Sequence, residues 1–86
     1  MSITKQTVAQ QFAAYLRHDL TLAQLVDWAE NALMEGEFEA RDAGTLAAVV
    51  GRLGVADVRA FGLTWEDCEQ LLRQVGVVAR VELVPA

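Results

Sequence analysis

The sequence predicts a mainly α-helical domain, a small orthogonal or up-down bundle of about four to five helices with one short C-terminal β-strand. Two observations carry this prediction. Apolar residues recur at helical spacing along most of the chain, and two Leu-Thr pairs, beginning at Leu20 and Leu63, open helical stretches with the same capping chemistry. Only residues 77–84 change to a two-residue period. A chain of 86 residues is expected to form one domain, residues 1–86.

The first predicted helix covers residues 3–17, and Ser2 or Thr4 is its expected cap. Its apolar face consists of Val8, Ala9, Phe12, Tyr15 and Leu16. A short polar break, residues 17–19, precedes the next helix. A break of that length predicts an antiparallel helical hairpin.

The clearest helix is residues 21–35. Thr21 is a good N-cap, and Gln24 stands at the capping-box position three residues later. One face collects apolar residues at a period of 3.6, namely Leu22, Leu25, Val26, Ala29, Ala32 and Leu33. Gly36 is the expected stop.

The third predicted helix covers residues 42–53, with an apolar stripe of Leu46, Val49, Val50 and Leu53. Gly44 and Gly51 weaken it, and glycines of this kind often permit close helix–helix approach. Residues 55–61 are expected to form one or two helical turns.

The last predicted helix covers residues 64–75. Thr64 is its cap and Asp67 occupies the capping-box position. The expected inward stripe is Trp65, Cys68, Leu71, Leu72 and Val75. Gly76 is the expected end of this helix.

The tail, residues 77–84, is predicted to be a strand, and a lone strand needs a partner for its backbone groups. The residues predicted to pair are Val77, Ala79, Arg80, Val81, Glu82 and Leu83. Three partners remain open: residues 2–4 of the same chain, a second copy, or a different protein. Antiparallel pairing of two copies about Val81 would place Arg80 opposite Glu82.

Net charge limits the class of partner. The chain has twelve acidic and seven basic residues, and its net charge of −5 argues against nucleic acid. No apolar run approaches the roughly 20 residues that span a membrane, and the N-terminus does not resemble a signal peptide. The single cysteine excludes an internal disulfide. These features predict a cytoplasmic protein without a membrane partner.

The residues that usually carry catalysis are scarce. Ser2 and His18 are the only serine and the only histidine, and Cys68 lies in an apolar stripe, where it is expected to be a small buried hydrophobe. One Cys and one His do not make a zinc site. The sequence therefore predicts no catalytic residues, no metal site and no cofactor.

The residues predicted to bind a partner are Trp28, Glu35, Glu37, Glu39 and Asp42. The acidic run is either a solvated surface or a face that attracts a basic protein. Trp28 lies about 100° from the centre of the apolar face of its helix. It is therefore either the edge of a second packing contact or an interface anchor.

The first helix, the short polar turn and the Leu-Thr-capped second helix together resemble small helical bacteriocin immunity proteins. The resemblance covers less than half of the chain and assigns no residue a role. The expected function is a non-catalytic intracellular bacterial protein–protein interaction module of immunity, antitoxin or adaptor type. Its partner would be another protein, a basic one or a second copy. The alternatives are a helix-turn-helix regulator built from residues 55–75 and a small-ligand-binding helical domain.

Overall fold

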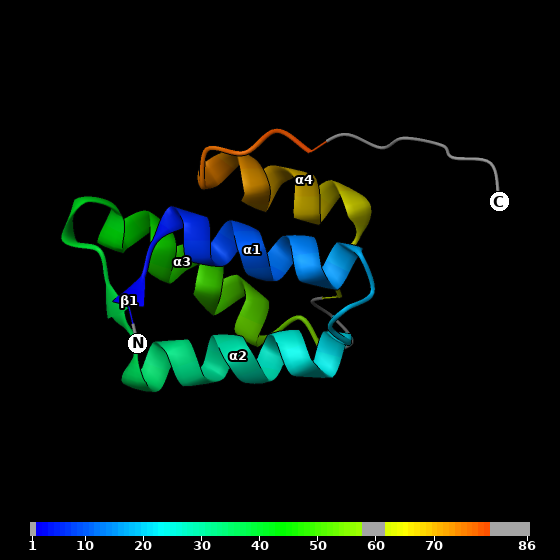
Figure 1. Cartoon of the computed structure of the whole chain (residues 1–86), viewed down its shortest axis with the longest axis horizontal. Coiled ribbons are helices and arrows are strands. Elements are labelled where there is room, and N and C mark those ends of the chain that lie inside the picture. The colour runs from blue at the N-terminus through cyan, green and yellow to red at the C-terminus, as the bar shows by residue number, and fades with distance from the viewer. Residues whose placement is uncertain (1, 58–61, 80–86) are drawn as a thin grey trace, which may run out of the picture.

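The structure, a computed structural model, describes residues 2–57 and 62–79. Its elements in chain order are β1 (Ser2–Ile3), α1 (Lys5–Leu16), α2 (Leu22–Glu35), β2 (Glu37–Phe38), the 3-10 turn η1 (Ala40–Asp42), α3 (Ala43–Gly54) and α4 (Trp65–Gln74). Four α-helices and one small sheet make up the described part of the chain (Figure 1). The predicted mainly α fold is confirmed.

Threonine begins three of the helices. The hydroxyls of Thr4, Thr21 and Thr64 each accept a hydrogen bond from the backbone N–H three residues later, at 3.1 Å in every case. The side chains at those later positions return a hydrogen bond to the N–H of the cap, which completes three capping boxes. A cap of this kind contributes about 1 kcal/mol. The two predicted boxes, at Thr21 and Thr64, are confirmed.

The helices enclose a single core. α1 and α2 run antiparallel as the predicted hairpin, α3 crosses obliquely between them, and α4 lies beside α1 on the side away from α2 (Figure 1). The most extensive helix–helix contact joins α2 to α3. The core side chains come from all four helices and β1: Ile3, Val8, Phe12, Leu25, Ala29, Ala32, Leu46, Val49, Val50, Leu53, Cys68, Leu71, Leu72 and Val75.

Helices α1 and α4 end with the same hydrogen-bond pattern, the Schellman motif. After α4, the N–H of Gly76 donates to the carbonyl of Arg73 at 3.0 Å, and that of Val77 donates to Leu72 at 2.9 Å. Gly76 has a φ of +81° and ends the helix as predicted.

After α1, the N–H of His18 donates to Tyr15 at 3.0 Å and that of Asp19 donates to Ala14 at 2.8 Å. His18 therefore takes the position that glycine takes after α4, with a φ of +67°. Left-handed backbone is unfavourable for a residue that carries a Cβ.

The small sheet joins two segments whose pairing the sequence did not predict. β1 and β2 run parallel, with Ser2 beside Glu37 and Ile3 beside Phe38. The first helix therefore begins at Lys5, two residues later than predicted. Residues 2–3 pair with β2, so the predicted pairing of residues 2–4 with the tail is not what the described residues show. Ile3 is fully buried, and Phe38 packs against the core.

The predicted C-terminal strand is wrong for its described part. Val77 and Ala79 are not in a strand, because the Val77 N–H donates to the carbonyl of Leu72 and closes the end of α4. Both side chains pack against the core. The predicted pairing residues Arg80, Val81, Glu82 and Leu83 lie outside the described residues. Dimerisation through them stays a prediction. In the predicted short helix 55–61, residues 55–57 form a turn and residues 58–61 lie outside the described part.

Two side chains predicted to face inward are exposed. Leu33 is 45% exposed because it lies in the last turns of α2, where α3 only partly covers it, and Trp65, the first residue of α4, is 37% exposed. The glycines of α3 do not mediate close packing either. A Cβ added at Gly44 or at Gly51 would meet no atom within 4 Å.

Candidate interaction surface

One segment of the chain accounts for its net negative charge. Between Arg17 and Arg41 there are six acidic residues and no lysine or arginine. The remainder of the chain, with six acidic and seven basic residues, has a net charge of +1. This segment, which contains α2 and β2, therefore has a net charge of −6.

Helix α2 presents three of these carboxylates. Asp27, Glu30 and Glu35 are exposed, whereas the opposite face of the helix packs into the core. The helix contains no basic residue that could pair with them. Glu35 was predicted to bind a partner, but Asp27 and Glu30 were not.

The strand β2 and the residue after it present two more. Glu37 and Glu39 are exposed, and Phe38 between them packs against the core. Side chains alternate along an extended backbone, so burial of Phe38 directs both carboxylates outward. The N–H of Glu39 donates to the carbonyl of Ile3 at 2.9 Å, which holds this segment beside β1.

Asp42 differs from the other predicted acidic residues. Its Oδ1 lies 3.6 Å from Nζ of Lys5, and the Asp42 side chain is half-buried. The ion pair joins the start of α1 to the end of η1. The remaining carboxylates, Asp27, Glu30, Glu35, Glu37 and Glu39, have no ion-pair partner in the described part of the chain. We refer to these five as the acidic face.

Trp28 lies at the edge of this surface. It is half-buried and packs against the core cluster, which agrees with a second packing contact. A role as an interface anchor stays a prediction. Its neighbours on the flank of α2, Gln24 and Asn31, are exposed. The structure thus leaves only part of the indole available for a partner.

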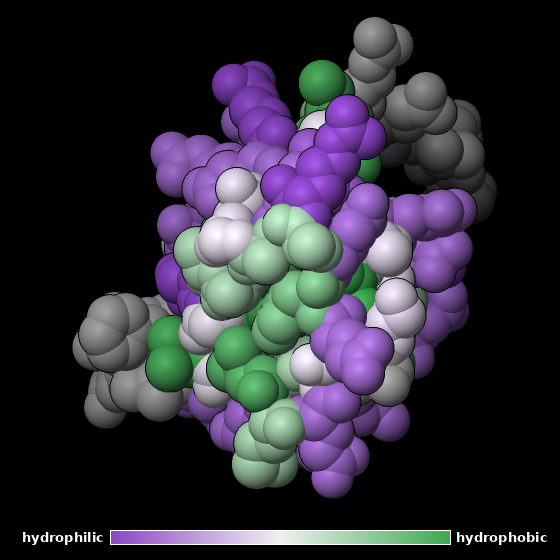
Figure 2. Space-filling view, turned by 90° about the vertical axis from the view of Figure 1, so that its left-hand side faces the viewer, coloured by the Kyte–Doolittle hydropathy of each residue, from purple (hydrophilic) through white to green (hydrophobic). Residues whose placement is uncertain are grey.

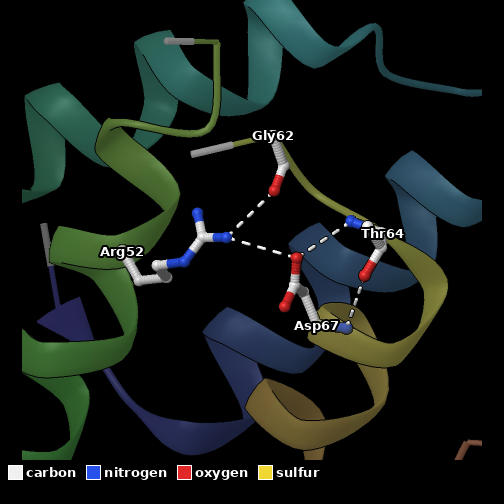
Figure 3. Close-up of polar contacts among 4 residues, drawn as sticks. All are labelled: Arg52, Gly62, Thr64 and Asp67. Atoms are coloured by element: carbon white, nitrogen blue, oxygen red, sulfur yellow. Dashed lines mark hydrogen bonds and ion pairs between the residues drawn. The ribbon is translucent and has the colours of Figure 1, made fainter. Parts of the chain in front are cut away.

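A second polar cluster ties α3 to α4 (Figure 3). Nη2 of Arg52 donates to the carbonyl of Gly62 at 3.0 Å and to Oδ2 of Asp67 at 3.3 Å. The same carboxylate oxygen accepts the N–H of Thr64 at 3.1 Å. Hydrogen bonds from the Thr64 backbone and side chain, and then the charge of Arg52, hold the pKa of Asp67 below its ordinary value. This cluster is structural, because it positions the start of α4.

Cys68 and His18, the only cysteine and the only histidine of the chain, lie in different surroundings. Cys68 is buried, and burial, followed by the nearby charge of Asp67, raises the pKa of its thiol. The prediction that Cys68 is a buried hydrophobe is confirmed. His18 is exposed in the turn after α1. Within residues 2–57 and 62–79, no three His, Cys, Asp or Glu side chains cluster as metal ligands would.

No helix in the described ranges is both long enough and apolar enough to span a bilayer. Comparison with protein-family models, with curated proteins and with solved structures found no significant match.

Proposed function

We propose that the protein is a non-catalytic interaction module of immunity, antitoxin or adaptor type that binds a basic protein in the cytoplasm. The observation that carries this proposal is the confinement of the net charge to the segment between Arg17 and Arg41. A surface that only kept the protein soluble would not need its charges segregated. Segregated charge steers association with an oppositely charged partner and lowers the affinity for others.

The acidic face is supported on rigid elements. Asp27, Glu30 and Glu35 project from a capped fourteen-residue helix, and Glu37 and Glu39 flank a side chain that packs on the core. A partner therefore meets carboxylates whose positions are set before binding. Preorganisation of this kind reduces the entropy lost on association.

The test uses capture followed by measured affinity. The tagged protein is incubated with lysate of its host at low and high salt, and co-purifying proteins are identified by mass spectrometry. A partner released by high salt is then produced and its affinity measured against salt concentration. Glu37→Gln with Glu39→Gln should slow association and flatten the salt dependence.

The matched control is Glu66→Gln with Glu69→Gln, which removes the same charge from α4. This control should leave association nearly unchanged. Equal effects of the two double variants would show that only net charge matters and would overturn the acidic face as a binding surface. Capture of a partner that is acidic, or whose affinity is independent of salt, would do the same.

A further inference from the structure

The outward side of α2 combines carboxylates with exposed apolar side chains. Met34 is 76% exposed, more than any other large apolar residue in the described part of the chain, and Leu33 beside it is 45% exposed. Figure 2 looks onto the end of the molecule where α2 finishes and α3 begins, and apolar surface gathers there within a hydrophilic frame. Isolated apolar residues on a surface need no explanation, but an apolar group next to unpaired charges has the character of a binding site.

Helical geometry places these groups in one row. At 100° per residue, the exposed residues Ala23, Asp27, Glu30, Leu33 and Met34 lie within about 120° of one another. We refer to these five residues as the α2 strip. From Ala23 to Met34 the strip is about 16 Å long, which is about three helical turns. It thus has two carboxylates in its middle and two apolar side chains at its C-terminal end.

The apolar end of the strip continues onto α3. Cδ1 of Leu33 lies 3.6 Å from the position that a Cβ on Gly54 would occupy. The lack of a side chain at Gly54 therefore leaves Leu33 uncovered on that side. The residue that follows, Val55, is 38% exposed. Exposed apolar side chains thus lie at the C-terminal ends of both α2 and α3.

We propose that the α2 strip is the binding site for a short cationic amphipathic helix of the partner protein. Lysine or arginine side chains of that helix would meet Asp27 and Glu30, and its apolar side chains would cover Leu33 and Met34. This binding site rests on the proposed function, because the helix that it would bind belongs to the same basic partner. An amphipathic helix binds a partner by laying its apolar face on apolar surface, with its charged side chains at the margin.

Charge excludes two other occupants of the strip. A second copy that presented the same strip about a two-fold axis would bring the carboxylates of both copies together, and like charges repel. The headgroups of an anionic membrane would be repelled in the same way. Neither objection applies to a basic helix.

The experiment uses a defined probe and the full chain. A fourteen-residue peptide of leucine and lysine, ordered so that one helical face is apolar and the other basic, is titrated into 15N-labelled protein. A shuffled peptide of the same composition and a peptide with glutamate in place of lysine are the probe controls. Amide shifts should centre on residues 23–34, and the two control peptides should bind at least tenfold more weakly.

Two variants distinguish binding at the α2 strip from nonspecific binding of the peptide to exposed apolar residues. Met34→Ser should weaken binding of the peptide about tenfold, the size expected for loss of an apolar anchor. Val78→Ser is the matched control, because Val78 is 70% exposed but follows α4. Both positions are exposed enough that folding, checked by circular dichroism, should be retained.

Two results of the titration would overturn the α2 strip as the binding site: no binding at millimolar peptide, or amide shifts centred outside residues 23–34. An equal loss of peptide affinity in Met34→Ser and Val78→Ser would do the same. So would self-association of the free protein through residues 23–34. Failure of the strip is distinguishable from failure of the proposed function. A captured basic partner that responds to the Glu37 and Glu39 substitutions but not to Met34→Ser would retain the function and reject the strip.

Discussion

Arg52 and Asp67, fifteen residues apart in the chain, meet at 3.3 Å and join the last turns of α3 to the first turn of α4. The carboxylate of Asp67 also closes the capping box of α4 through Thr64. One side chain thus both begins a helix and fixes its position against another helix. Several measurable consequences arise from this contact and from the backbone positions described above.

The contact of Asp67 predicts a dependence of stability on pH. The folded-state pKa of Asp67 lies below its ordinary value of 3.8, so its ionised form stabilises the fold above about pH 4. That contribution is lost as the pH falls through the folded-state pKa. Urea unfolding of Asp67→Asn should therefore give a lower free energy of unfolding than the native protein at pH 7, with a difference that shrinks below pH 4.

The control for this prediction is Glu66→Gln, which removes one charge from the same turn of α4. An identical pH profile in the two variants would show that the contacts of Asp67 with Thr64 and Arg52 are not responsible for it.

Gly51→Ala should stabilise the protein. Gly51 lies inside α3, and a Cβ there would meet no atom within 4 Å. Alanine favours the helix over glycine by about 0.5–1 kcal/mol. In a domain of this size a gain of 1 kcal/mol raises the melting temperature by roughly 4–8 °C, which thermal denaturation measures directly. A decrease in melting temperature would mean that Gly51 is needed for packing.

Gly36→Ala should have the opposite effect. A Cβ at Gly36 would lie 2.5 Å from the carbonyl oxygen of Ala32 and 2.8 Å from Cγ1 of Ile3. The backbone oxygen cannot move without distorting the end of α2, so a loss of about 1–3 kcal/mol is expected from overpacking. Urea denaturation measures the loss, and faster amide exchange at Glu39 would locate it at β1 and β2. Unchanged stability would show that β1 adjusts without cost.

His18→Gly should stabilise the turn between α1 and α2. His18 has a φ of +67° and closes the Schellman motif of α1, where glycine is unstrained. Relief of the left-handed backbone is worth about 1 kcal/mol, reduced by the greater freedom of glycine in the unfolded chain. Gly76→Ala, at the equivalent position after α4, should lose a similar amount. Differential scanning calorimetry of both variants tests the pair, and a shift in the same direction for both would contradict the shared motif.

The local signals in the sequence were sufficient for the helices. Two capping boxes, Thr21 with Gln24 and Thr64 with Asp67, predicted the starts of α2 and α4. The buried residues of α3 are those that its apolar period predicted. Helix α1 was predicted to begin two residues too early because the sequence offered both Ser2 and Thr4 as caps, and the cap in the structure is Thr4. β1 and β2 have two residues each, and a strand that short has no period to detect.

The candidate surface was predictable only in part. Glu35, Glu37 and Glu39 were recognised as an acidic run and are exposed, but Asp42 pairs with Lys5, a contact that depends on where η1 meets α1. Asp27 was missed, although the absence of lysine and arginine between Arg17 and Arg41 was a visible signal.

The sequence by itself determined where α2 and α4 begin and which face of each helix is apolar, because caps and periodicity act within one or two turns of the chain. Tertiary structure decided which apolar residues stay in water. Leu33 belongs to the apolar stripe of α2 by period, yet it is exposed because α3 ends at Gly54 beside it. The same holds for the Arg52–Asp67 contact and the β1–β2 pairing. Each depends on the packing of segments distant in sequence, which no local pattern encodes.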